Sequence, residues 1–337
     1  MNQVYVCGTF FQIYVSILKT IHRPHKSSKS LIILNDHTPD IEKIIPLLRE
    51  NGYFDFHLFV PFRKIEETLN KENGIIGKTI HRNKNSIRAV EQNSDIGKYS
   101  EYIKESEFNL FYLWGLPSAY FVLKYPDNYA RVIEDGARNY VFKTSDFKHF
   151  KRKYILKTYV GDGLDDAVKE IQVQNPEALH TRIRHKGTKL ELQRMQTSLS
   201  PEDNRRILNV FMKDLTIELP DQQKFLLITQ PVETKQFSED LKVQLYSDIL
   251  EEYSKDYTVY IKPHPRELTN YKEKLGRNFV EIPRAFPLEM FDLMKNITFD
   301  EGLTLYSSSL KNLSCVRKKT HLGKEYLIEW SVKHKKY

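Results

Sequence analysis

Hydrophobic runs that end in polar strings recur along this chain, and they restrict its fold more than any other feature. The run Ala130–Ile133 ends in Glu134-Asp135-Gly136, and the run Tyr257–Ile261 ends in Lys262-Pro263-His264-Pro265. Short runs of this kind are typical of strands buried on both faces of a parallel sheet. Ligands bind at the carboxyl edge of such sheets. The two strings therefore predict ligand-binding loops at the edges of two sheets.

Strand-like and helix-like segments alternate in the first half of the chain, which indicates a parallel sheet with crossover helices. We expect helices at Phe11–Ile21 and Ile41–Asn51. The expected strands are Val4–Cys7, Leu31–Leu34, Phe56–Val60, Leu110–Leu113 and Ala130–Ile133. From Tyr140 to about Ser200 the strand signal fades, and basic clusters such as Phe150–Tyr154 appear instead.

A second α/β pattern follows a helix start at Ser200-Pro201. Its expected elements are strand Phe225–Thr229, helix Glu239–Tyr253, strand Tyr257–Ile261, strand Phe279–Ile282, helix Leu288–Lys295 and strand Leu303–Tyr306. The sequence thus predicts two doubly wound, Rossmann-like domains that face each other across a cleft. We expect the first domain, which contains the general base, over residues 1–205. The second domain, which binds the nucleotide, is expected over 206–315, and a basic tail is expected over 316–337.

Composition indicates a globular protein with an anionic partner. The 337 residues are 40% hydrophobic and 28% charged, with a net charge of +8. This charge favours a nucleotide, a phospholipid or a nucleic acid as partner. Cys7 and Cys315 form no CxxC pair, as is usual in a reducing compartment. The apolar stretch Val4–Leu18 reads as strand, turn and helix rather than a secretion signal, so we expect a cytoplasmic protein.

The two strings also carry complementary chemistry. The acid pair Glu134-Asp135 is suited to general-base catalysis, and His264 is suited to bind or protonate a phosphate leaving group. Taken singly, each string reads first as an ordinary turn at the end of a strand. Spacing adds to the second one: Glu289 lies 25 residues after His264, and Ser307–Ser309 lie 43 to 45 residues after it. Successive βα units would place these groups along one sheet edge, where serines suit phosphate and a carboxylate suits ribose.

The order of these motifs resembles that of bacterial sialyltransferases of glycosyltransferase family 52, which include lipooligosaccharide and capsule sialyltransferases, and of the related polysialyltransferases. Two further strings fit the resemblance. Gly8-Thr9-Phe10-Phe11-Gln12 is similar to a TPFQ-like segment, with Phe10 in place of proline, and Leu226–Pro231 is similar to an ITQP-like strand end. The resemblance implies a GT-B fold and an inverting transfer of sialic acid from CMP-sialic acid to a galactoside of a bacterial surface glycan.

Roles for single residues are implied by the same resemblance. Glu134 would deprotonate the acceptor hydroxyl with support from Asp135, and Gly136 would permit the tight turn. His264 would stabilise the departing CMP phosphate, with Pro265 fixing its loop. The remaining assignments are Lys262 to the cytosine, Glu289 to the ribose, Ser307, Ser308 and Ser309 to the phosphate, and Gly8, Thr9 and Gln12 to the substrate loop.

No cofactor or metal is expected. Asp162, Asp165 and Asp166 form the nearest approach to a metal-binding cluster, and we interpret them as part of a solvated loop that leads into a helix. The tail 316–337 holds seven Lys/Arg and two Glu, interleaved with aromatic residues. This composition suits peripheral contact with the anionic inner face of the plasma membrane, or alternatively a solvated helix packed on the body.

Three other functions stay open. A CDP-glycerol or CDP-ribitol phosphate transferase of the teichoic-acid type also has a His-Pro motif like His264-Pro265. A family 52 transferase can use another sugar nucleotide. A nucleic-acid-binding protein would match the charge, although no nucleic-acid module is visible. The acceptor, the linkage, the number of sugars added and the oligomeric state, including a dimer, are not given by the sequence.

Overall fold

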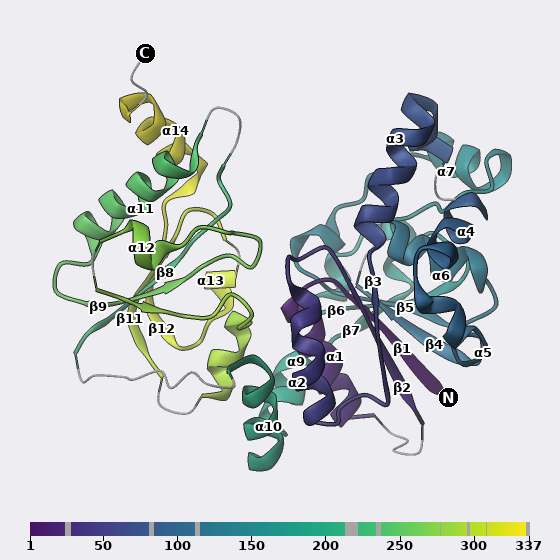
Figure 1. Ribbon diagram of the computed structural model, residues 1–337, viewed down its shortest axis with the longest axis horizontal. Coiled ribbons are helices and arrows are strands. Elements are labelled where there is room, and N and C mark those ends of the chain that lie inside the picture. Colours follow the sequence, from purple (N-terminus) through teal and green to yellow (C-terminus); the bar gives the residue numbers. More distant parts are fainter. Residues whose placement is uncertain are drawn as a thin grey trace. The chain divides into compact units, whose positions relative to one another are not determined.

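The computed structural model describes residues 1–23, 28–80, 84–111, 115–212, 222–233, 237–276, 278–294, 297–307 and 309–334. The chain divides into two compact units, Met1–Ser200 and Pro201–Tyr337. Each unit is built on one parallel sheet, as Figure 1 shows. The expected first domain ended at residue 205, which lies inside helix α10 (Pro201–Met212), and this helix belongs to the second unit.

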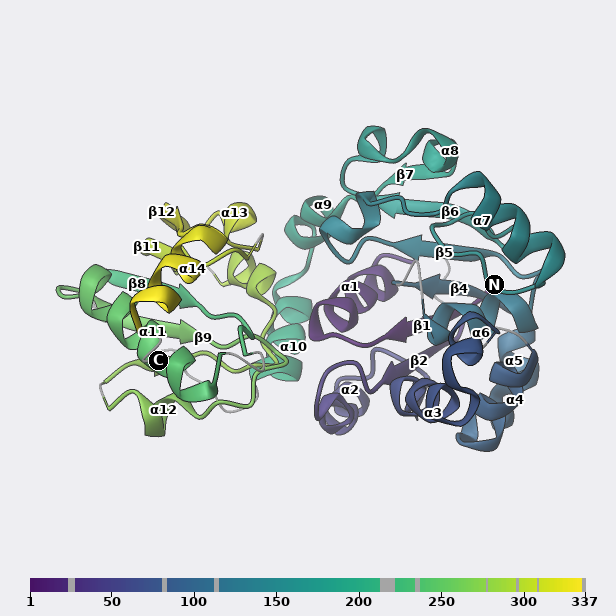
Figure 2. The same ribbon diagram turned by 90° about the horizontal axis from the view of Figure 1, so that it is seen from above.

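The first unit contains a seven-stranded sheet in the order β3-β2-β1-β4-β5-β6-β7. Figure 2 labels the strands of this sheet from β2 to β7 in that order. Every neighbouring pair is parallel. The strands are β1 (Asn2–Cys7), β2 (Ser30–Asn35), β3 (Phe56–Val60), β4 (Ser106–Leu110), β5 (Ala130–Ile133), β6 (Val168–Val173) and β7 (Gly187–Lys189). The α-helices are α1 (Phe10–Ile21), α2 (Ile45–Glu50), α3 (Phe62–Ile80), α4 (Lys84–Gln92), α5 (Ser100–Lys104), α6 (Leu116–Lys124), α7 (Asp146–Phe150), α8 (Thr181–Arg184) and α9 (Leu192–Thr197).

Five shorter helical segments complete the unit: η1 (Ile41–Ile44), η2 (Asp95–Tyr99), η3 (Ala137–Tyr140), η4 (Lys151–Ile155) and η5 (Pro176–Ala178). The core lies between one face of the sheet and the helices that cross it. Val4, Leu31, Phe108 and Val132 project from the strands into this core, and Tyr120 of α6 is fully buried there. The strands therefore hold their carboxyl ends, and the loops that follow, in fixed positions.

Strands β6 and β7 lie in the segment that we expected to lack strands. The reason is visible in β6, where Val168, Ile171 and Val173 are buried while Lys169 is exposed and Glu170 is half-buried. Because polar residues interrupt the hydrophobic run, the sequence pattern does not show this strand. Strand β4 likewise lies four residues before its expected position, because Glu107 and Asn109 point to the polar face of the same sheet.

The second unit contains a five-stranded parallel sheet in the order β10-β9-β8-β11-β12. The strands are β8 (Lys224–Ile228), β9 (Thr258–Lys262), β10 (Val280–Glu281), β11 (Phe299–Thr304) and β12 (Val316–His321). The helices besides α10 are α11 (Glu239–Tyr253), α12 (Tyr271–Lys274), η6 (Leu288–Leu293), α13 (Ser309–Asn312) and α14 (Gly323–His334). Ser238 caps α11 by accepting a hydrogen bond from the backbone N–H of Leu241, as is typical of helix starts.

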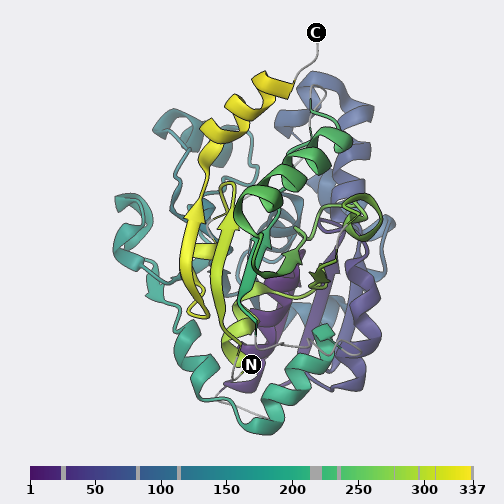
Figure 3. The same ribbon diagram turned by 90° about the vertical axis from the view of Figure 1, so that its left-hand side faces the viewer.

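The expected tail 316–337 is not a separate segment. Figure 3 shows β12, in yellow, beside β11 and leading into α14. Arg317 and Lys318 of β12 pair with Asp300 and Glu301 of β11, so the basic charge is partly neutralised within the sheet. Trp330 of α14 is buried in the core of this unit. Residues 335–337 lie outside the described part of the chain.

Candidate functional site

Glu134 follows β5 directly and is held by three hydrogen bonds. Its Oε2 accepts from the backbone N–H of Gln174 at 2.5 Å and from the hydroxyl of Tyr140 at 2.9 Å. Its Oε1 accepts from Nε2 of Gln174 at 3.3 Å. Only 7% of Glu134 is exposed. The carboxylate is therefore fixed in one orientation at the carboxyl edge of the first sheet.

The two residues after Glu134 form the turn that the sequence predicted. The backbone N–H of Asp135 donates to Oδ1 of Asn139 at 2.8 Å, which closes the loop onto η3. Gly136 has φ 109° and ψ −160°. No atom lies within 4 Å of a Cβ placed at Gly136, so the backbone conformation rather than space requires glycine.

The loop after β1 reaches the same edge of the sheet. The backbone N–H of Gly8 donates to Oε1 of Gln12 at 2.6 Å, and Thr9 caps α1 by accepting from the backbone N–H of Gln12. The side chain of Gln12 is fully buried, and its Nε2 has no hydrogen-bond partner among the described residues. Burial raises the pKa of the Cys7 thiol to about 12, and the charge of Asp135 contributes to this increase. The loop after β1 and the acid pair are therefore close together.

His264 lies in the turn after β9 of the second unit. Its backbone N–H donates to Oε2 of Glu267 at 2.7 Å and lies 3.3 Å from Oγ1 of Thr229. The backbone N–H of Arg266 donates to Nδ1 of His264 at 3.2 Å. Because Nδ1 acts as an acceptor, the proton of the neutral ring is on Nε2. The imidazole can therefore donate a hydrogen bond through Nε2.

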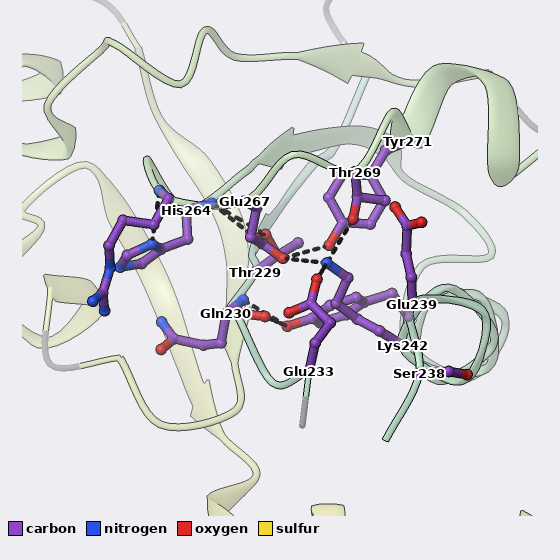
Figure 4. Close-up of polar contacts among 12 residues, drawn as sticks. Thr229, Gln230, Glu233, Ser238, Glu239, Lys242, His264, Glu267, Thr269 and Tyr271 are labelled. Atoms are coloured by element: carbon purple, nitrogen blue, oxygen red, sulfur yellow. Dashed lines mark hydrogen bonds and ion pairs between the residues drawn. The ribbon is translucent and has the colours of Figure 1, made fainter. Parts of the chain in front are cut away.

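Glu267 organises the turn, and the sequence did not reveal it. Figure 4 shows its buried carboxylate among the groups that it joins. The carboxylate of Glu267 accepts hydrogen bonds from the hydroxyls of Thr229 and Tyr271 as well as from the backbone N–H of His264. It also forms an ion pair with Lys242 at 3.2 Å. Lys242 is fully buried and also bonds Glu233 and Thr269. The only feature of the local sequence that points to Glu267 is its position three residues after His264.

Lys262 precedes the turn and is also buried. Its ammonium donates to the carbonyl of Pro263 at 2.7 Å and to that of Arg284 at 3.3 Å. Burial lowers the pKa of Lys262 to about 7, although the charges of Glu267 and Glu289 oppose this shift. The side chain thus holds two backbone carbonyls together. Its contact with a cytosine stays a prediction.

The other predicted donor-binding groups lie along the same edge. Glu289 is in η6, and burial raises the pKa of its carboxyl despite the nearby charge of Lys262. Ser307 follows β11, and its Oγ accepts from the backbone N–H of Ser309 at 3.3 Å. Ser308 lies outside the described residues. Pro265 is half-buried in the turn after His264. The predicted residues thus form two groups, one at the sheet edge of each unit.

The acid cluster at residues 162–166 is not a solvated loop. Asp162 and Asp165 are buried, and both accept hydrogen bonds from the chain around them. Asp162 accepts from the backbone N–H of Lys143 and the hydroxyl of Thr144, and Asp165 accepts from two backbone N–H groups, those of Val160 and Gly161. In the part of the chain that the structure describes, no three His, Cys, Asp or Glu residues are grouped to hold a metal ion.

A hollow of about 300 Å³ lies beside α1 in the first unit. It is lined from the strands by Gln3, Glu107, Arg131 and Gln172, and from α1 by Lys19, among others. Gln3, Glu107 and Arg131 are each the second residue of their strand, whereas Gln172 is the second-last residue of β6. The carbonyl of Gln172 accepts from the backbone N–H of Glu134 at 2.9 Å, so the hollow borders the edge that carries Glu134 at this position. No helix in the described residues has the length and apolar character needed to cross a membrane.

Comparisons with known proteins agree with this architecture. The profile of glycosyltransferase family 52 matches residues 78–321. An uncharacterized protein of Haemophilus influenzae is 29% identical over 182 residues, which is 53% of this chain and 57% of that relative, so the chain spans little more than half of its length.

Two solved structures resemble this chain over most of its length. The first is an α/β-galactoside α-2,3-sialyltransferase of Photobacterium phosphoreum, with a TM-score of 0.57 and 14% identity, over 94% of this chain and 89% of that one. The second is the UDP-GlcNAc 2-epimerase of Neisseria meningitidis, with a TM-score of 0.51 and 12% identity, over 92% and 79%. At these identities the likeness shows the fold. The two α/β units, each built on a parallel sheet, have the GT-B fold, which confirms the predicted fold class.

Proposed function

We propose, from the premise that this chain belongs to glycosyltransferase family 52, that it is an inverting sialyltransferase. Its donor is CMP-sialic acid, and its acceptor is a terminal galactoside of a bacterial surface glycan, either a lipooligosaccharide or a capsule. The α-2,3-sialyltransferase of Photobacterium phosphoreum, which has the same fold, supports this choice of sugar. The observation that carries the proposal is the His264 turn, whose hydrogen bonds leave the imidazole proton on Nε2.

The proposed reaction uses the two groups of residues in complementary roles. Glu134 accepts the proton of the acceptor hydroxyl while the hydroxyl oxygen forms a bond to the anomeric carbon. The bond between that carbon and the phosphate oxygen of CMP breaks, and its electron pair stays on the phosphate. His264 donates a hydrogen bond or its proton from Nε2 to this oxygen, which stabilises the leaving group. Attack opposite to the departing phosphate inverts the configuration.

The remaining residues bind and position the substrates in this proposal. Lys262 contacts the cytosine, Glu289 accepts hydrogen bonds from the ribose, and Pro265 shapes the histidine turn. Ser307, Ser308 and Ser309 donate to the phosphate, aided by the backbone N–H groups that follow β11. Gly8, Thr9 and Gln12 line the acceptor side, where the unsatisfied Nε2 of Gln12 is a donor for a sugar hydroxyl. Asp135 supports Glu134, and Gly136 provides the turn.

The reaction as proposed needs no metal ion. The acids closest to a metal-binding set are already engaged: Asp162 and Asp165 accept hydrogen bonds from the chain, and Asp166 pairs with Lys153 at 2.8 Å. Charge on the leaving phosphate is instead stabilised by His264 and by the serine loop.

A melting-temperature screen with CMP, CDP, UDP and GDP tests the choice of nucleotide. A ligand that binds only the folded state at about 100 times its Kd adds about 2.7 kcal/mol of stability. We expect CMP to raise the melting temperature most, and the Lys262→Met and Glu289→Gln variants to reduce this shift. A larger response to CDP would favour a glycerol- or ribitol-phosphate transferase. A larger response to UDP or GDP would favour a family 52 enzyme with another donor and contradict the proposal.

A further inference from the structure

One helical stretch of the first unit exposes large apolar side chains to solvent. Helix α7 and the π-type turn η4 run without a break from Asp146 to Ile155. The exposed fractions are 74% for Phe147, 54% for Phe150, 59% for Tyr154 and 62% for Ile155. Phe147, Phe150 and Tyr154 have the i, i+3, i+7 spacing of one helix side, and the rings of the last two are 5.4 Å apart.

This exposure is concentrated at one place. Eleven large hydrophobic residues are exposed in the described part of the chain, and five of them lie between Val141 and Ile155. Figure 2 shows α7 at the outer rim of the first unit. Scattered apolar residues are normal on protein surfaces, but a contiguous group commonly marks an interaction site. This group is therefore a candidate interaction surface.

Positive charge surrounds the same apolar group. Residues 143–157 contain six Lys/Arg residues and one acid, Asp146. Lys148, Lys151 and Lys157 are exposed, and within the described ranges no acidic side chain forms an ion pair with any of them. We call the helical stretch 146–155 together with the two residues that follow it, 146–157 in all, the aromatic-basic helix. Its combination of exposed aromatic rings and unpaired lysines is that of a helix lying in a lipid–water interface.

The aromatic-basic helix is held in place by its polar side. Nη1 of Arg152 donates to the carbonyl of Val160 at 2.8 Å, and Lys153 pairs with Asp166. Asp146 pairs with Arg182 at 2.9 Å. These contacts use the basic residues of the inner side and leave the aromatic side facing outward. The surface is thus preformed, and binding would cost little conformational entropy.

We propose that the aromatic-basic helix docks this protein on the surface of an anionic lipid bilayer. Phe147, Phe150 and Tyr154 enter the headgroup region while Lys148, Lys151 and Lys157 contact anionic headgroups. The surface is a different one from the sequence-derived expectation of a basic tail at 316–337. In that segment Arg317 and Lys318 pair with acids of β11, and Lys319 donates to the carbonyl of Lys311.

Vesicle co-sedimentation of the full chain tests the proposal. The vesicles are pure phosphatidylcholine, or phosphatidylcholine mixed with an equal amount of phosphatidylglycerol. We expect binding to the mixed vesicles only, with a decrease as salt rises, since screening acts within about 10 Å at 0.1 M. The charge variant is Lys148→Gln with Lys151→Gln and Lys157→Gln, and we expect it to bind about fivefold more weakly per lysine removed.

Two further variants separate the apolar contribution from surface charge in general. The aromatic variant, Phe147→Ser with Phe150→Ser, should bind mixed vesicles at least about tenfold more weakly, because burial of the two rings is lost. A matched control changes exposed residues of α14: Ile328→Ser, Val332→Ser, Lys324→Gln and Lys333→Gln. The control should bind as the unmodified chain does. Melting temperatures establish that all variants are folded.

A spectroscopic readout reports insertion directly. In a Phe147→Trp variant, lipids brominated near the headgroup should quench the added tryptophan only when phosphatidylglycerol is present. The proposal is overturned if the chain does not bind mixed vesicles, or if the charge and aromatic variants bind them normally. It is also overturned if the α14 control alone loses binding, which would place the contact on 316–337. If the aromatic variant instead converts a dimer to a monomer with vesicle binding unchanged, the helix joins two copies of the chain.

Discussion

The backbone N–H of His264 lies 2.7 Å from Oε2 of Glu267, whose other oxygen lies 3.2 Å from Nζ of the buried Lys242. The turn that contains His264 is therefore hydrogen-bonded to one member of a buried ion pair, in addition to its attachment to its own strand. Thr229 and Tyr271 donate to the same carboxylate. Since a buried charge that loses its partner is costly, this arrangement links the position of His264 to the stability of the whole second unit.

The first prediction concerns this ion pair. Lys242→Met should lower the free energy of unfolding by about 3 kcal/mol, because it leaves Glu267 charged and buried without its cation. Glu267→Gln should cost a similar amount. The double variant should cost less than the sum of the two, as expected for residues in one network. Urea unfolding measures all three.

Lys274→Met is the matched control for the ion pair. Lys274 pairs with Glu239 and Asp240 near the surface, and such exposed pairs contribute less than about 1 kcal/mol. Strictly additive effects of Lys242→Met and Glu267→Gln would contradict the network.

The second prediction concerns the orientation of Glu134. Burial raises the pKa of Tyr140 to about 12, and its hydrogen bond to Glu134 adds to this shift, so the hydroxyl stays protonated as a donor. Tyr140→Phe should lower kcat about tenfold and leave KM for the donor sugar unchanged, because a positioned base loses one of its supports. Tyr129→Phe also removes a hydroxyl that donates to a carboxylate, that of Glu170, and should have no effect on kcat. Equal losses in the two variants would show a general effect on the sheet.

The third prediction concerns acid stability. Burial alone would raise the pKa of Glu170, but hydrogen bonds from Thr188 and Arg131 and the charge of Arg131 lower it to about 2. A carboxyl with a depressed pKa in the folded state stabilises the fold above its unfolded pKa, near 4.5. This stabilisation is lost as the pH falls toward 2. Glu170→Gln should therefore cost about 2 kcal/mol at neutral pH and less as the pH approaches 3.

Urea unfolding between about pH 3 and pH 7 measures the acid stability, with the unmodified chain as reference. In the Glu170→Gln variant, Arg131 still pairs with Glu107, whose Oε2 lies 3.8 Å from Nη1 of Arg131, so the sheet face retains one ion pair. A constant difference between the two proteins over this range would contradict the depressed pKa of Glu170.

The fourth prediction is that transfer does not depend on a divalent cation. Activity should survive saturating EDTA, and Asp162→Asn should lower stability instead, because Asp162 accepts from Lys143 and Thr144. Loss of activity on chelation that Mg²⁺ or Mn²⁺ restores would contradict the proposed mechanism. In that case Asp162, Asp165 and Asp166 would be the residues to test as ligands.

The sequence predicted those elements whose hydrophobic pattern is uninterrupted. Strands β3 and β5 and helix α11 have the bounds that the pattern indicated. Strands β6 and β12 were missed, since Glu170 and Lys318 occupy strand positions that face other polar groups. Strand β7 was missed because its three residues, Gly187–Lys189, include no hydrophobic side chain. Polar side chains paired across neighbouring strands are compatible with a sheet, but the local pattern does not show their partners.

The sequence predicted those residues of the candidate site whose position is determined by the end of a strand. Glu134 and His264 each follow a buried strand, and this placement can be read locally. Glu267 could not be recognised, because its role depends on Lys242, which comes from the middle of α11, 25 positions earlier. The membership in glycosyltransferase family 52 and the GT-B fold, both implied by short motifs in a fixed order, are confirmed.

The central claim is that this chain transfers sialic acid from CMP-sialic acid. The most direct measurement follows CMP release and product formation by NMR, with CMP-sialic acid and a β-galactoside as substrates. We predict stoichiometric release of CMP and a product whose anomeric configuration is inverted relative to the donor. His264→Ala and Glu134→Ala should each lower the rate at least about 10²-fold while the melting temperature stays near that of the unmodified chain. Transfer from another sugar nucleotide but not from CMP-sialic acid, or near-normal rates in either variant, would contradict the account.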